Sequence, residues 1–351
     1  MNSRERVLAA MDLKPLDRVP TDIWATGEVW EKLRAHFGPD ADIRERLGID
    51  GFAGVGAAYI GPPPPTPPEG ETADMWGIRS RTVAYDGGVY SEMTFHPLAA
   101  ARTIDDLEAY RWPSTDWFDY SQIRDAAAER GKTHAVMCGY MCPLFEHNKL
   151  RGLELSLMDP LLEPDFTRHL LARLCDFLYE HHRRMFEAAD GLIDVAQVTD
   201  DLGSQHGPLL SLPVYRDFYR PHHERFIALC REFGIRVFHH DDGSCRAFLP
   251  DLVDLGIHVL NPIQWTCPGM DLAELKAEFG TRLCFHGAVD NQRILPFGTP
   301  DDVRAEVRRC IDILAADGTG YILAPCHNIQ AVSPVESILA MYDEARAYGR
   351  W

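Results

Sequence analysis

The residues best suited to metal chemistry form one run in the second half of the chain, His239-His240-Asp241-Asp242. They follow directly on a short apolar stretch at residues 235–238 and precede a glycine. In α/β enzymes the active site collects where buried parallel strands end in this way. Because side chains alternate along an extended backbone, His240 and Asp242 should point to the same side. The pair could supply one imidazole and one carboxylate to a single ion.

A second apolar stretch, residues 320–325, ends at Cys326 and His327. A thiolate from Cys326 would join His240 and Asp242 as two anionic ligands and one neutral ligand, which balance a divalent cation. Three protein ligands with an open fourth position are typical of a catalytic zinc site. We therefore predict that His240, Asp242 and Cys326 bind one zinc ion. The alternative is a solvated His–Asp pair, with Cys326 as a packing residue.

Other polar residues stand at or near the ends of predicted strands and could orient a substrate or move a proton. On a barrel they would converge on one face, because every parallel strand ends there. The expected catalytic residues are Asp200, Asp201, His286 and His327, and the expected substrate-binding residues are Trp24, Tyr140, Gln205, Asn261, Gln264 and Asp290. For Asp200, Asp201 or Asp290 taken alone, helix capping or a turn is an equally good interpretation.

The elements that must position these side chains alternate regularly from about residue 130. Strand patterns cover residues 133–142, 192–198, 235–240, 259–264, 282–285 and 320–325. Helical patterns lie between them, and near-continuous apolar strands of this kind indicate a parallel sheet covered on both faces. Seven or eight such units predict an α/β fold of the (β/α)8, or TIM-barrel, type. No Gly-x-Gly-x-x-Gly follows the first strand, which weakens a dinucleotide-binding interpretation.

We expect a single barrel domain over residues 1–351, with an N-terminal α/β elaboration at 1–125 and regular units at 126–351. The elaboration should contain a helix at residues 3–12 with Ser3 as a possible N-cap, and a first strand at 18–24. Residues 62–68 include six prolines, which excludes a helix or a central strand. A surface loop is expected there, with peptide binding by a polyproline segment as a minor alternative. Short β-like pieces follow at residues 79–85 and 89–95.

The composition disfavours several kinds of partner. There are 53 acidic residues against 35 Lys and Arg, and the resulting formal charge of −18 repels the phosphate backbone of nucleic acids. No apolar run approaches the ~18 residues of a membrane span. The N-terminus does not resemble a signal peptide, so we expect a cytoplasmic protein without a membrane partner. Nine cysteines fit reduced thiols better than a disulfide framework. Oligomerisation is possible.

Four segments resemble the uroporphyrinogen decarboxylase superfamily. They are residues 1–20, Asp74-Met75-Trp76-Gly77, the His-x-x-Gly loop at 240–243, and Cys326-His327-Asn328-Ile329-Gln330. The resemblance spans nearly the whole chain and implies a (β/α)8 barrel. True decarboxylases of this superfamily are metal-free and carry an Arg-Gln-Ala-Gly-Arg-Tyr motif after the first strand, which holds substrate carboxylates. Here residues 24–30 stand at that place and contain no arginine, so binding of a polycarboxylate is disfavoured.

The resemblance also extends to cobalamin-dependent methyltransferases, which include methylcobamide:coenzyme M enzymes and aromatic O-demethylases. These bind zinc through a His-x-Cys pair and a later Cys. His240 and Cys326 match the first and last positions, and Asp242 stands where the middle Cys would be. Exchange of thiolate for carboxylate keeps the ligand charge and makes the metal a stronger Lewis acid, suited to polarising an ether or phenolate oxygen.

The resemblance therefore implies a zinc-dependent methyltransferase component. It would move a methyl group between a small substrate, such as a methyl ether, and the cobalamin of a separate corrinoid carrier protein. Two alternatives remain open. One is a metal-independent decarboxylase or lyase acting on another small acid, and the other is a non-catalytic barrel that binds a small ligand.

Overall fold

The computed structural model describes residues 1–85 and 87–350. Its centre is a seven-stranded parallel sheet in the order β1-β7-β8-β9-β10-β11-β12. The strands are β1 (Phe52–Val55), β7 (Ala135–Met141), β8 (Val195–Val198), β9 (Arg236–His240), β10 (Val259–Asn261), β11 (Cys284–Val289) and β12 (Tyr321–Pro325). Each strand after the first lies beside its predecessor in the sheet, as expected for successive β/α units.

An irregular segment at residues 20–26 lies between the two edge strands and closes the sheet. On one side it forms parallel bridges to Leu323 and Ile329. On the other side the carbonyl of Thr21 accepts hydrogen bonds from the amides of residues 50–51, just before β1. The predicted first strand is thus in place but is not a regular strand, since its proline has no N–H for a ladder. The chain forms the expected (β/α)8 barrel, with this segment in the eighth position.

The interior of the barrel is apolar at one end and polar at the other. A buried apolar layer is formed by Ala135, Val195, Val259, Cys284 and Ile322. Helix α1 (Ser3–Met11) packs on this layer and covers the amino-terminal end of the strands. Side chains alternate along a strand, so the next inward positions follow two residues later. At several strands these positions are polar, and they comprise Gln197, His240, Asn261 and His286.

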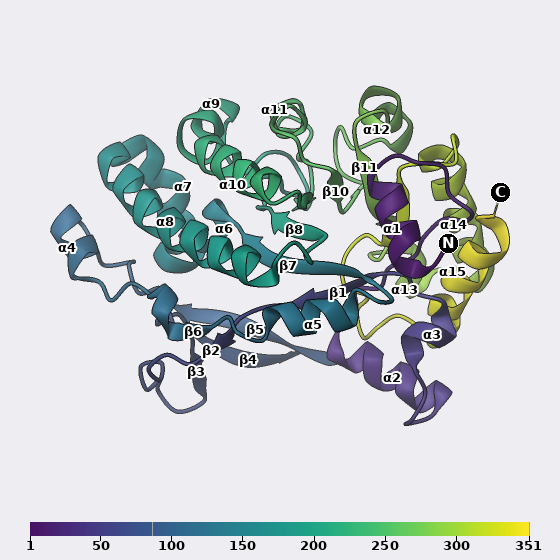
Figure 1. Cartoon of the computed structure of the whole chain (residues 1–351), viewed down its shortest axis with the longest axis horizontal. Helices are drawn as coiled ribbons and strands as arrows, with labels where there is room; N and C mark the ends of the chain where they lie inside the picture. Colours follow the sequence, from purple (N-terminus) through teal and green to yellow (C-terminus); the bar gives the residue numbers. More distant parts are fainter. Residues whose placement is uncertain (86, 351) are drawn as a thin grey trace.

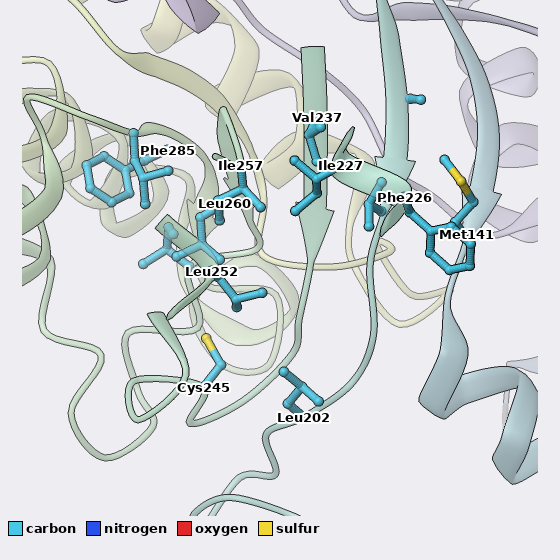
Figure 2. Close-up of a cluster of buried hydrophobic side chains, with 14 of the residues drawn as sticks. Met141, Leu202, Phe226, Ile227, Val237, Cys245, Leu252, Ile257, Leu260 and Phe285 are labelled. Carbon is cyan, nitrogen blue, oxygen red and sulfur yellow. The ribbon is translucent and has the colours of Figure 1, made fainter. Parts of the chain in front are cut away.

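Helices cover the outside of the barrel (Figure 1). The main ones are α5 (Ile123–Arg130), α8 (Pro164–Ala189), α10 (Arg220–Glu232), α11 (Leu249–Leu255), α12 (Leu272–Phe279), α14 (Pro300–Leu314) and α15 (Val335–Tyr348). Figure 2 shows part of a second hydrophobic core, between the strands and these helices. There, strand residues such as Val237 and Leu260 belong to the same cluster as Phe226 of α10 and Leu252 of α11. The strands are therefore apolar on both faces, which explains their near-continuous apolar sequences.

The N-terminal part adds a three-stranded antiparallel sheet to one side of the barrel (Figure 1). Its strands are β3 (Glu71–Ala73), β4 (Arg79–Tyr85) and β5 (Gly88–Phe95), and a separate short pair is formed by β2 (Ala58–Tyr59) and β6 (Phe118–Asp119). The proline-rich segment 62–68 has neither helix nor strand, as its prolines predict. Helices α2 (Gly27–Phe37), α3 (Ile43–Leu47), α4 (Ile104–Ala109) and η1 (Thr115–Trp117) complete this part.

The structure corrects several predicted boundaries. Asn2, and not Ser3, caps α1, because its side chain forms a reciprocal capping box with Glu5. The segment after β7 forms two helices, α6 (Pro143–Arg151) and α7 (Leu153–Leu162), separated by a glycine with a φ of 85°. The remaining short helical turns are α9 (Leu212–Val214), η2 (Tyr215–Tyr219) and α13 (Ile294–Phe297). Strand β11 begins and ends later than predicted, so His286 lies inside it.

Over residues 1–85 and 87–350, no helix combines the length and the apolar character that a membrane span would require.

Candidate metal centre and adjoining pockets

Three potential metal ligands meet at the carboxyl end of the barrel. They are His240, Asp242 and His327, and their ligand atoms all lie within 4.8 Å of one another. Asp242 Oδ2 is 3.6 Å from His240 Nε2 and 3.4 Å from His327 Nε2. His240 ends β9 and Asp242 follows two residues later, so both face the same side, as alternation predicts. Two imidazoles and one carboxylate form a ligand set that suits zinc and other divalent transition metals.

Cys326 lies beside this cluster. In the described part of the chain, the group of ligand atoms at coordinating distances includes His327 and does not include Cys326. The thiol is 5% exposed and lines the same pocket as Asp242 and His327. Burial, reinforced by the carboxylates of Asp242 and Asp290, raises the pKa of Cys326 well above its usual range. The structure thus brings His240 and Asp242 together with His327, which we predicted as catalytic, and places the predicted ligand Cys326 in the adjoining wall.

Asp201 adds a second carboxylate to the cluster. Its Oδ1 atom is buried 3.7 Å from His240 Nε2 and has no hydrogen-bond partner among the described residues. Burial raises the pKa of Asp201. Burial would lower the pKa of His240, but Asp242, Asn261 and Asp201 together outweigh it and raise that pKa to about 9. The cluster therefore favours positive charge, and its unpartnered oxygen and donor set fit a divalent cation.

A chain of buried hydrogen bonds sets the orientation of the His240 ring. Its Nδ1 donates to Asn261 Oδ1 at 2.6 Å, and Asn261 Nδ2 donates to His286 Nδ1 at 2.7 Å. His286 Nε2 in turn donates to Asp22 Oδ2 at 3.1 Å, and the same oxygen accepts from Trp24 Nε1 at 3.1 Å. With the proton on Nδ1, the neutral imidazole of His240 keeps its Nε2 lone pair free for a metal. Asn261, predicted to bind substrate, and His286, predicted to be catalytic, thus lie behind the ligand as its supports.

Trp24 separates the apolar interior of the barrel from its polar end. Its ring stacks on His240 with a centroid separation of 5.4 Å and meets the ring of His327 edge-on at 6.2 Å. It also packs against the buried apolar layer that α1 covers. The predicted substrate-binding residue Trp24 is therefore a partly buried wall beside two of the three candidate ligands.

A pocket of about 340 Å³ opens beside the cluster. Besides Asp242, Cys326 and His327, its polar lining consists mainly of carboxamides, from Gln205, Gln264, Asn291, Gln292 and Gln330. Gln205 and Gln264 were both predicted to bind substrate. Within the described chain, no arginine or lysine contributes to this lining. Such a pocket suits a small, neutral, polar molecule better than a polycarboxylate, which needs cationic partners.

Asp200 and Asp290 make other contacts. The Asp200 side chain is 0% exposed, and it accepts hydrogen bonds from two amides at the start of α6 and from His223 Nε2 at 2.9 Å. The Asp290 carboxylate accepts from the amides two and three residues further along the chain. Neither residue lines the pocket. The structure therefore favours the capping interpretation for Asp200 and the turn interpretation for Asp290 over the chemical roles that we predicted.

Tyr140 lies at a second pocket, of about 460 Å³. The ladder between β7 and β8 is irregular here, Gly139 has a φ of 94°, and the Tyr140 amide donates to His182 Nε2 at 2.9 Å. Residues of β1, β8, α6 and α8 also contribute to the lining, and none of them lines the metal pocket. The tyrosine is therefore available to a ligand, although not beside the candidate ligands.

The sequence did not predict the pocket residues Asn291, Gln292 and Gln330, nor Asp22 and His223, which hydrogen-bond to predicted residues. Asp22 stands two residues before Trp24, so alternation along the predicted strand would have placed both on the inner side. His223 lies in a helical pattern, and no local signal connects it with Asp200, which is 23 residues away along the chain.

Comparison with known proteins identifies the family of this chain and solved structures that share its fold. The uroporphyrinogen decarboxylase (URO-D) family model matches residues 104–348. Among curated relatives, uroporphyrinogen decarboxylase from Dechloromonas aromatica is 25% identical over 182 residues, which are 48% of this chain and 49% of the relative. The enzyme of the same name from Methylibium petroleiphilum is 30% identical over 105 residues, 29% of this chain and 27% of the relative. The chain thus spans about half or less of the curated relatives it matches. A solved methyltransferase from Methanosarcina mazei has the same fold, with a TM-score of 0.65, 21% identity and 99% of each chain covered.

Proposed function

Because the chain belongs to the uroporphyrinogen decarboxylase family, we propose that it is an enzyme, and specifically a metal-dependent methyltransferase component. It would move a methyl group between a small neutral substrate and the corrinoid of a separate carrier protein. His240, Asp242 and His327 would hold the metal, with zinc the best candidate, and Asp201 and Cys326 adjoin them. The observation that carries the proposal is this cluster of ligand atoms within 4.8 Å of one another, facing a pocket lined by carboxamides.

The bound metal would act as a Lewis acid toward a heteroatom of the substrate. The protein's own groups prepare the site for this role. Asn261 accepts the Nδ1 proton of His240, so that displacement of the Nε2 proton by the metal would leave the Nε2 lone pair as the ligand. The carboxamides of Gln205 and Gln264 can donate and accept hydrogen bonds, and so orient a neutral polar substrate. Trp24 closes the inner side of the site against the apolar interior.

A decarboxylase is the second candidate, since the curated relatives carry that name. Holding several substrate carboxylates requires guanidinium or ammonium groups. The pocket beside His327 is lined by the carboxylate of Asp242 and by neutral groups, within the part of the chain that the structure describes. This charge balance favours methyl transfer from a neutral molecule over decarboxylation of a polycarboxylate.

Metal analysis of the purified protein tests the proposal. The expected result is about one zinc ion per chain in the wild type, and loss of that zinc in the His240→Ala and His327→Ala variants. The Cys326→Ser variant decides between the two ligand sets, because zinc loss there with retention in His327→Ala would identify Cys326 as the third ligand. Zinc retained in full by His240→Ala would refute the metal centre.

Activity then separates the two candidate reactions. The protein is mixed with cob(I)alamin and a panel of methyl ethers, methylamines and methyl thioethers, and formation of methylcob(III)alamin is followed by its absorption spectrum. A methyltransferase should form it with at least one donor and lose that activity with a chelator. Release of CO2 from a carboxylic acid, unaffected by chelator, would instead identify a decarboxylase.

A further inference from the structure

The second pocket, beside Tyr140, is a cavity that shares no lining residue with the metal pocket. It lies where β1 and β7 end and is bounded by α8 on one side. Two glycines at the end of β1, Gly54 and Gly56, line it. A Cβ atom added at either position would have no neighbouring atom within 4 Å. Glycine inside a strand often marks a place where a ligand approaches the backbone closely. The open space here is therefore maintained by the absence of side chains from one wall.

The pocket contains one buried charged group without a full set of partners. Glu146 of α6 is 7% exposed, and its Oε1 pairs with the Lys149 ammonium at 3.0 Å. Its Oε2 is buried and has no hydrogen-bond partner among the described residues. Burial raises the pKa of Glu146, while the ion pair with Lys149 acts in the opposite direction. Glu146 lines the cavity, and its buried oxygen without a partner would be satisfied by a hydrogen-bond donor from outside the chain.

The rest of the lining is apolar, aromatic or neutral. Aromatic rings and thioethers come from Met75, Trp76, Met137, Tyr140, Phe177 and Met185. Two imidazoles also line it, and burial lowers the pKa of His181 to about 4 and that of His182 to about 3, so both are neutral at physiological pH. Thioethers and aromatic rings form favourable contacts with a flat π system. The volume of about 460 Å³ is ample for one or two fused rings.

We propose that this second pocket binds a neutral, flat ring that carries one hydrogen-bond donor, and that Glu146 Oε2 accepts the hydrogen. The aromatic and thioether side chains would hold the faces of the ring, and Gly54 would leave room for its edge. This site shares no lining residue with the metal pocket. The proposal therefore stands independently of the metal and of methyl transfer, and it can be tested on metal-free protein.

Indole and 1-methylindole are suitable probes, because the indole N–H donates and cannot accept, and the methyl group removes it. Binding of each is measured by isothermal titration calorimetry with chelator-treated, full-length protein. We expect indole to bind with a stoichiometry of one, about ten-fold more tightly than 1-methylindole, as for one hydrogen bond to a charged acceptor. Equal affinities of the two probes, or no binding of indole, would overturn the proposal.

Two variants test the residues involved. In Glu146→Gln the Lys149 ammonium should keep the amide oxygen on its own side, so that NH2 replaces the acceptor in the pocket. Indole should then lose its roughly ten-fold advantage over 1-methylindole. Gly54→Leu should place a large side chain in the cavity, since its Cβ meets no protein atom within 4 Å, and it should abolish binding of both probes.

The matched control is Glu154→Gln, the same change at an exposed position of the neighbouring helix α7, which should bind both probes like the wild type. Unchanged selectivity in Glu146→Gln, or unchanged binding in Gly54→Leu, would contradict the assignment of this pocket.

Discussion

Asn261→Ala tests whether a buried amide holds the candidate metal ligand in place. The Asn261 side chain is 1% exposed and bridges the Nδ1 atoms of His240 and His286 at 2.6 and 2.7 Å. Alanine removes both hydrogen bonds and leaves two ring nitrogens in the barrel without partners. Each buried unsatisfied group costs about 1–3 kcal/mol. The free energy of unfolding should therefore fall by about 2–6 kcal/mol, measured by urea denaturation of the metal-free protein.

The same change should weaken metal binding. Without the bond at Nδ1 the ring of His240 can rotate or change tautomer, and supports of this kind contribute about 10–100-fold to metal affinity. Zinc affinity is measured by competition with a chromophoric chelator at neutral pH. Asn148→Ala is the control, because it removes an amide that bonds to Ser156 on α7, away from the ligands. It should cost about 1 kcal/mol of stability and leave zinc binding unchanged. A folded Asn261→Ala protein with wild-type zinc affinity would refute the reasoning.

Three further predictions concern the barrel that carries the site. Gly139→Ala should lower the free energy of unfolding in urea more than Gly191→Ala does. Both glycines have positive φ values, but at Gly139 the new Cβ would also lie 2.6 Å from an imidazole of α8. We expect a loss of about 1 kcal/mol at Gly191 and of at least about 2 kcal/mol at Gly139, and equal losses would argue against this close contact. Burial lowers the pKa of His147 to about 3, whereas the unfolded chain protonates near the ordinary value of about 6.5. The contribution of neutral His147 to the free energy of unfolding should thus be complete above about pH 6.5. It should decrease as the pH falls toward 3, by on the order of 1.4 kcal/mol per pH unit, and His147→Phe should show a smaller slope in unfolding experiments. Asp50→Asn should lower stability by about 3–5 kcal/mol in thermal denaturation, because this fully buried carboxylate pairs with both Arg18 and Arg6, and Arg6 would keep just its second partner, Asp17; a loss under 1 kcal/mol would contradict this role.

Much of the fold could be predicted because its signals are local. Strands buried on both faces read as continuous apolar runs, and helices between them show their own period, so the barrel follows from counting units. The strand at 79–85 was predicted with the bounds that the structure has. The first strand was less predictable, since residues 20–26 complete the barrel through a few bridges to β12 and bonds to residues 50–51. Such closure depends on partners far away in the chain.

The site was predictable where alternation applies. His240 and Asp242 flank the end of a strand, and an extended backbone points them the same way. Cys326 and His327 follow the end of β12, where the backbone is no longer extended and the period of two no longer gives a direction. The sequence therefore could not decide which of these two neighbours reaches the other ligands. The role of Asp200 was equally hidden, because its partners lie in α6 and α10.

By itself, the sequence determined the acidic charge, the order of strands and helices, and the inward direction of His240. These depend on composition and on the periods of strands and helices, which are properties of short stretches of chain. Only the tertiary structure decided that Asp22, Asn261 and His286 form one hydrogen-bonded support, and that Glu146 faces a second pocket. These contacts join separate strands and helices, and their distances depend on how the sheet closes and how helices pack on it. Packing of that kind is set by the whole chain at once, so no local pattern could reveal it.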